Sequence, residues 1–67
     1  MLQLHERLRK IVEASGLSQT AFAEKMGISL ASQKNYEKGL RSPDSKYIER
    51  LHLAGYDAMY VITGEAN

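Results

Sequence analysis

The sequence contains no cysteine, which excludes disulfide bonds and thiolate metal sites. Its two histidines, His5 and His52, lie far apart on different predicted helices, so we expect no metal ion and no other cofactor. No apolar run approaches the roughly 20 residues that a membrane-spanning helix needs, and nothing resembles a secretion signal. These absences predict a cytoplasmic protein that has no contact with a membrane.

Basic residues are missing from the last part of the chain. All nine lysines and arginines lie in residues 1–50 beside six acids, whereas residues 51–67 hold only two acids, Asp57 and Glu65. This distribution is typical of a protein with a polyanion on one side, although an ordinary solvated surface remains the alternative. A length of 67 residues predicts one domain, residues 1–67, stabilised by tight helix packing or self-association.

Strand patterns are also lacking, because no segment alternates apolar and polar residues over the length of a strand. Apolar residues recur instead at helical spacing, which predicts an all-α fold. The five expected helices cover about residues 2–15, 19–26, 30–38, 43–54 and 58–63. Ser18, Ser29 and Asp57 are the expected N-caps of the second, third and fifth helices. For the fourth helix we expect Ser42 as the cap and Pro43 as the first residue.

Residues 18–38 have the spacing of a helix-turn-helix, in which a three-residue turn joins two short helices. Steep crossing of the two helices requires a small residue at the crossing and a turn residue that tolerates positive φ, and Ala23 and Gly27 meet these requirements. Four apolar residues can pack around the turn: Phe22, Met26, Ile28 and Tyr36. A two-helix hairpin of a plain bundle would show the same features, so the spacing alone leaves both interpretations open.

The predicted third helix has two unlike faces. At about 100° per residue, Tyr36 lies opposite a short, polar and cationic face that contains no acid. The residues of that face are Leu30, Ala31, Lys34, Asn35 and Lys38. On DNA, Asn35 can pair with adenine, the two apolar residues can contact a thymine methyl group, and Lys34 can reach guanine or a phosphate. A solvated face with routine lysines is the alternative.

Two further places suit DNA phosphates. The second helix begins at Ser18 and Gln19, where free backbone N–H groups and the positive end of the helix dipole attract anions. After the third helix, Lys38 and Arg41 flank Gly39, and we expect this glycine to let the DNA backbone approach closely. Such contacts fix the register on the duplex rather than read its sequence.

Three stretches follow one another along the chain: GLSQTAFAEKMGIS at residues 16–29, YEKGLRSPD at 36–44 and GYDAMYVITG at 55–64. Together they resemble the motifs of the repressor/Cro-like helix-turn-helix regulators, the phage-repressor group also called the XRE family. The resemblance covers about residues 4–64 and implies a compact five-helix fold like that of the lambda repressor. It also implies sequence-specific binding to double-stranded operator DNA and control of transcription initiation, often in a phage or prophage switch.

The resemblance also implies roles for individual positions. By position it places base contacts at Leu30, Ala31 and Asn35, with Lys34 beside them. It places phosphate contacts at Gln19, Ser29, Lys38 and Arg41.

The chain departs from the family pattern in the middle of the third helix. Gln33 stands where the family usually has a branched aliphatic residue, and an amide that faces inward must find a partner. Val12 replaces an arginine that many relatives pair with the residue at Glu37. Glu37 must therefore find another partner, such as Arg9 or Arg41, or remain in water.

One domain of this kind covers about half of a typical site, so we expect a homodimer on a palindromic operator. The segment Tyr56–Ile62 is apolar on more than one side, which suggests the dimer interface, while completion of the monomer core is the alternative. A second class of function is a protein-interaction module of the antitoxin or anti-repressor type. No clustered nucleophile, metal ligands or phosphate-binding loop indicates an enzyme or a small-molecule site.

Overall fold

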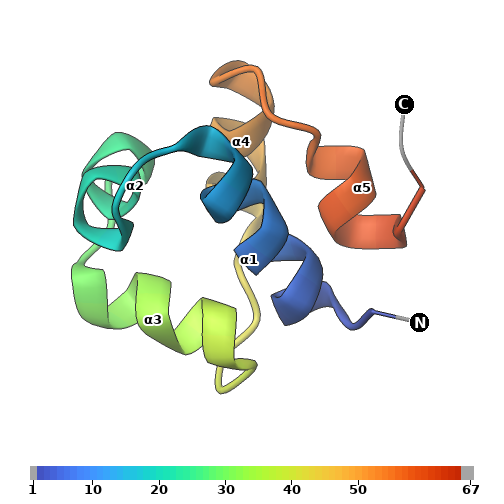
Figure 1. The fold of residues 1–67 in the computed structure, drawn as a ribbon, viewed down its shortest axis with the longest axis horizontal. Coiled ribbons are helices and arrows are strands. Elements are labelled where there is room, and N and C mark those ends of the chain that lie inside the picture. The colour runs from blue at the N-terminus through green and yellow to red at the C-terminus, as the bar shows by residue number, and fades with distance from the viewer. Residues whose placement is uncertain (1, 66–67) are drawn as a thin grey trace.

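The computed structural model describes residues 2–65, which form five helices around one core (Figure 1). The helices are α1 Leu4–Ser15, α2 Gln19–Met26, α3 Leu30–Lys38, α4 Ser45–Leu53 and α5 Ala58–Thr63. This part of the chain contains no strand, and none of its helices has the length and apolar character required to cross a bilayer. The all-α prediction is confirmed, and α2 and α3 have the predicted bounds.

Side-chain caps explain where α2, α3 and α5 begin. The hydroxyls of Ser18 and Ser29 and a carboxylate oxygen of Asp57 each accept the backbone N–H three residues further on. Each cap satisfies an N–H that has no acceptor inside its own helix. The three predicted N-caps are therefore confirmed.

The fourth helix begins later than the sequence predicted. Its N-cap is Asp44, whose Oδ1 accepts the Tyr47 N–H at 2.9 Å, so Ser42 and Pro43 precede the helix instead of opening it. A carboxylate at this position both accepts the N–H and interacts favourably with the positive end of the helix dipole. The prediction of a Ser42 cap was therefore wrong.

The first helix also begins after the predicted start. Gln3 is its N-cap, and Gln3 and Glu6 form a reciprocal capping box. The Glu6 carboxylate accepts the backbone N–H of Gln3 at 3.1 Å. This arrangement fixes Leu4 as the first helical residue.

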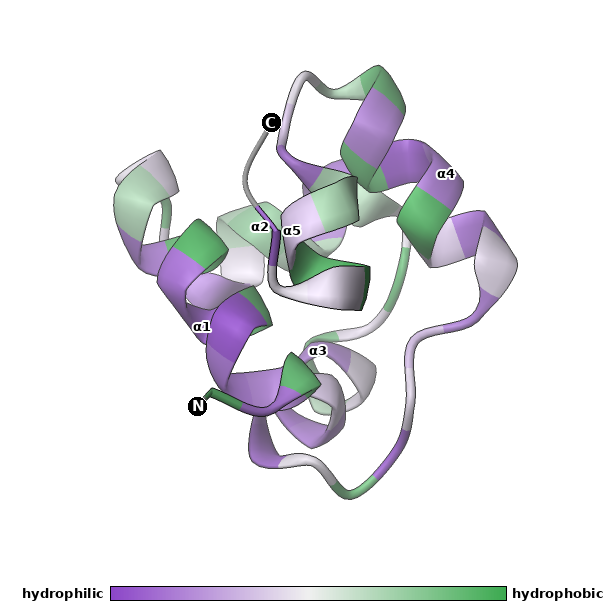
Figure 2. Cartoon of the chain, turned by 90° about the vertical axis from the view of Figure 1, so that its right-hand side faces the viewer, coloured by the Kyte–Doolittle hydropathy of each residue, from purple (hydrophilic) through white to green (hydrophobic). Residues whose placement is uncertain are grey.

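The core takes side chains from all five helices. Its buried members are Leu8, Val12, Phe22, Met26, Tyr36, Tyr47, Leu51, Ala58 and Val61. Figure 2 shows apolar and polar bands alternating along α1 and α4, the pattern of helices that bury one face. Of the predicted apolar stripe of α1, Leu8 and Val12 are buried, while Leu4 and Ile11 pack at the edge of the core.

The turn between α2 and α3 depends on a glycine. Gly27 has a φ of 74°, a conformation that strains residues with a side chain. A Cβ at this position would also meet the guanidinium of Arg50, which reaches the turn from α4. Ala23, which is 2% exposed, supplies the small buried residue that the helix crossing needs. The small residue at the helix crossing and the turn glycine with positive φ, both predicted for residues 18–38, are therefore present.

Candidate nucleic-acid interface

One aromatic residue holds the inner face of α3. Tyr36 is buried, and its ring meets that of Tyr47 edge to face with 5.0 Å between the centroids. The four residues predicted to contact bases are exposed or half-buried: Leu30, Ala31, Lys34 and Asn35. The burial of Tyr36 agrees with the predicted orientation of α3, while contact of the four residues with bases stays a prediction.

Gln33 lies on the inner side of α3 and is fully buried. Its Nε2 donates a hydrogen bond to Glu37 Oε2 at 2.9 Å, and its Oε1 accepts one from the Tyr47 hydroxyl at 2.7 Å. Burial raises the pKa of Tyr47 and the Glu37 carboxylate adds to this rise, so the hydroxyl stays protonated and donates. The amide thereby links α3 to α4.

Glu37 is the one acidic residue of α3, and its side chain is turned into the protein. Gln33, rather than Arg9 or Arg41, donates to its carboxylate. Arg9 reaches the same residue from α1, but it donates to the Glu37 backbone carbonyl at 2.7 Å. Because this negative charge is buried, the charged side chains that α3 exposes are the cations Lys34 and Lys38.

The residues predicted to contact phosphates lie at helix ends. The hydroxyls of Ser18 and Ser29 are N-caps, and each accepts one backbone N–H of the helix that follows. The first turn of each helix has further N–H groups without an acceptor inside the helix, and these can bind an anion. Gln19 is half-buried as the first residue of α2. Lys38 and Arg41 are exposed at the end of α3 and in the loop that follows it.

Gly39, between these two cations, is exposed, and a side chain of α1 lies beside it. A Cβ at Gly39 would lie 2.8 Å from Nδ1 of His5, so this imidazole of α1 packs directly on the glycine. Close approach of a DNA phosphate at Gly39 stays a prediction, and the structure adds His5 beside this glycine. Sequence reasoning missed the contact between His5 and Gly39, because the spacing of residues along one helix does not show which other segment lies beside it.

A family model described as Helix-turn-helix matches residues 8–54, which contain α2, α3 and α4 in full. The chain belongs to the XRE-type helix-turn-helix family. It is therefore a DNA-binding regulator of transcription, and its family is not one of enzymes. No curated protein and no solved structure gives a match.

The last helix of this helix-turn-helix protein is shared between core and surface. Within Tyr56–Ile62, Val61 is fully buried, whereas Met59 and Ile62 are 50% and 48% exposed. Arg7 ties the segment to α1, because its Nε and Nη2 donate to the backbone carbonyls of residues 61 and 62 at 3.0 and 3.1 Å. One side of α5 thus completes the monomer core, and the other presents apolar side chains to solvent.

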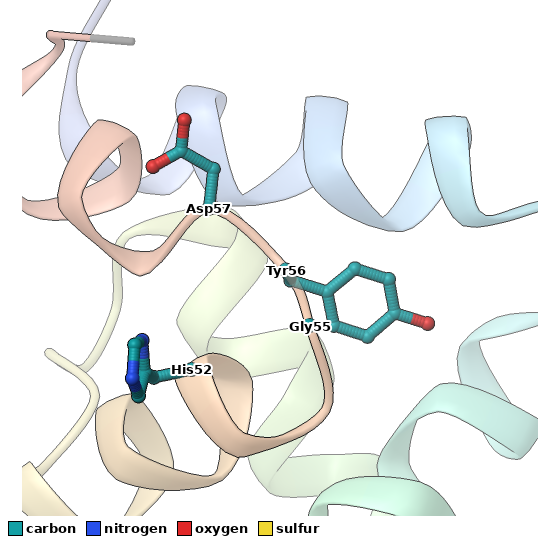
Figure 3. A pocket seen from close by; sticks show the side chains of 4 residues that line it. All are labelled: His52, Gly55, Tyr56 and Asp57. Carbon is teal, nitrogen blue, oxygen red and sulfur yellow. The ribbon is translucent and has the colours of Figure 1, made fainter. Parts of the chain in front are cut away.

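A shallow hollow of about 320 Å³ lies at the junction of α4 and α5, lined by His52, Gly55, Tyr56 and Asp57. Figure 3 shows the His52, Tyr56 and Asp57 side chains pointing in different directions. Asp57 caps α5, and the Tyr56 ring packs on Phe22 with 5.2 Å between centroids. Ligand pockets bring polar groups together, whereas the polar side chains around this hollow do not converge.

Proposed function

We propose that the protein is a repressor of the phage or prophage type that binds a palindromic operator as a homodimer. In each copy, α3 enters a major groove of the DNA. The observation that carries this proposal is the pair of unlike faces on α3, with Tyr36 and Glu37 buried and two lysines exposed. Such a face presents positive charge and short side chains to the duplex and no acid to repel phosphates.

Within this arrangement, the exposed face of α3 reads the bases. Asn35 pairs with adenine, Leu30 and Ala31 contact thymine methyl groups, and Lys34 reaches guanine or a phosphate. The predicted phosphate contacts are Ser18, Gln19, Ser29, Lys38 and Arg41. Because the first two residues of α3 are apolar, we expect specificity to depend more on methyl contacts and DNA shape than on hydrogen bonds.

The size of the molecule supports binding as a dimer. Its Cα atoms extend over 27 × 24 × 23 Å, less than the roughly 34 Å that separate successive major grooves on one face of B-DNA. One copy therefore places α3 in one groove only. The half-exposed Met59 and Ile62 on α5 suit contact with a second copy, which would double the interface with DNA.

Selection from a random duplex pool tests the operator. We expect an enriched palindrome whose half-sites lie about 10 base pairs apart, and a steep loss of affinity between about 50 and 200 mM salt. Enrichment of a single asymmetric half-site would contradict the dimer. Failure to enrich any sequence, with no binding to duplex DNA at low salt, would instead favour a protein-interaction module.

A further inference from the structure

We propose that His5 is an additional phosphate contact whose contribution depends on its protonation, so that operator affinity rises as the pH falls. This inference rests on the proposed function, because it requires the loop after α3 to face the DNA backbone. It adds to that function a residue of α1 that lies outside the helix-turn-helix.

His5 lies beside the glycine at which the sequence predicted close approach of a DNA phosphate. The atoms of its ring nearest to a Cβ built on Gly39 are Nδ1, Cε1 and Cγ, so Nε2 lies farther from that position. Together with Arg41 and Ser42, the two residues line one cleft of about 130 Å³ beside the loop after α3. An anion at this cleft would therefore meet the imidazole as well as the loop.

The charges around the cleft favour an anion. The lining residues, all within the described part of the chain, are Gln3, Leu4, His5, Tyr36, Gly39, Arg41 and Ser42, and none is acidic. Arg41 brings a positive charge from the loop. A protonated His5 and Arg41 would both line the cleft as cations, and a phosphate bound there would interact favourably with each of them.

The other charged groups near His5 are engaged or point elsewhere. On α1, the Glu6 carboxylate accepts the Gln3 N–H, and Arg9 donates to the Glu37 carbonyl. On α3, Lys38 is an exposed cation at the helix end.

The sign of the pH dependence follows from these contacts. Imidazole gains its positive charge within the range of about pH 8 to pH 5. A phosphate beside the ring favours the charged form, so DNA binding takes up a proton at His5. Lowering the pH therefore strengthens binding.

The test compares three single variants with the wild type by fluorescence anisotropy on a mixed-sequence duplex of roughly 25 base pairs. Affinity is measured at constant ionic strength from about pH 8 to about pH 5.5. The variants are His5→Gln, His5→Arg and, as the matched control, His52→Gln, because His52 lies exposed on α4 in the hollow lined by Gly55.

We expect the wild type and His52→Gln to bind about three- to tenfold more tightly at the lower pH. His5→Gln should lose this gain, whereas His5→Arg should bind tightly at both pH values because its charge is permanent. Rescue by arginine excludes simple damage to the fold. If His5→Gln keeps the pH profile of His52→Gln, the inference is overturned while DNA binding stands. If the wild type binds no duplex at any pH, both the proposed function and this inference are wrong.

Discussion

At the scale of single residues, the inner side of α3 is organised by one amide. Gln33 carries a donor and an acceptor, so it satisfies the Glu37 carboxylate and the Tyr47 hydroxyl at the same time. An aliphatic residue would fit the same space but would satisfy neither partner. The polar network thus links α3 to α4 and keeps the one acid of α3 away from its exposed face.

Replacing this amide should destabilise the protein. We expect Gln33→Leu to lower the free energy of unfolding by about 1–3 kcal/mol, because two buried polar groups lose their partner. Urea denaturation measures the change. Adding Tyr47→Phe to the same variant removes one of the orphaned groups and should make the second substitution cost less than it does in the wild type. A Gln33→Leu variant as stable as the wild type would contradict the role of the network.

The half-buried Asn35 and the exposed Arg41 should separate base reading from backbone contact. We expect Asn35→Ala to cost about 1–3 kcal/mol on the selected operator and to relax the preference at one base pair. Arg41→Ala should weaken binding to all sequences alike. It should also reduce the slope of log affinity against log salt concentration by about one, because one phosphate contact is lost. Titrations of both variants on operator and scrambled duplexes at several salt concentrations measure the affinity, the sequence preference and the salt dependence of each variant. Identical behaviour of the two variants would refute the assignment.

These residues also show what the sequence could and could not predict. The helical wheel predicted that Tyr36 faces inward, because that inference needs only the period of one helix. The resemblance to the family implied that Gln33 would need a partner if it faced inward, but Tyr47 comes near it only when α4 packs against the rest of the protein. The contact between His5 and Gly39 is likewise tertiary, and for this reason it was missed.

At the scale of elements, the start of α4 tests the capping argument. We expect Asp44→Ala to lower the free energy of unfolding by about 1 kcal/mol, because the N–H of Tyr47 loses its acceptor. Ser42→Ala is the matched control and should change it by less than about 0.5 kcal/mol. Chemical denaturation of both variants decides between the two caps. A larger effect at Ser42 would restore the start that the sequence predicted.

The elements differ in how far local sequence determines them. For α2 and α3, a serine cap and a closing glycine bound each helix, and the predicted bounds agree with the structure. Before α4, the residues Ser42, Pro43 and Asp44 offer two alternative starts. Proline suits a first helical position, but Asp44 provides the carboxylate cap. Local sequence preference alone could not show whether Ser42 or Asp44 caps α4.

At the scale of the whole molecule, α5 differs from the other helices because it carries no lysine or arginine. Each of the other four helices has an exposed lysine, whereas α5 presents the half-exposed Met59 and Ile62. The sequence predicted this division from the absence of basic residues after Arg50. It could not show which apolar residues of Tyr56–Ile62 are buried, because that depends on how α5 packs against α1 and α4.

The apolar side of α5 supplies the last prediction. We expect the double variant Met59→Glu with Ile62→Glu to be monomeric and to bind the operator more weakly than the wild type, because two like-charged patches would face each other across the two-fold axis. Sedimentation equilibrium with and without DNA measures the assembly. Ala14→Glu, which places the same charge on an exposed residue of α1, is the control and should leave self-association unchanged. A wild-type protein that stays monomeric at tens of micromolar in both conditions would show that this side of α5 is not a dimer interface.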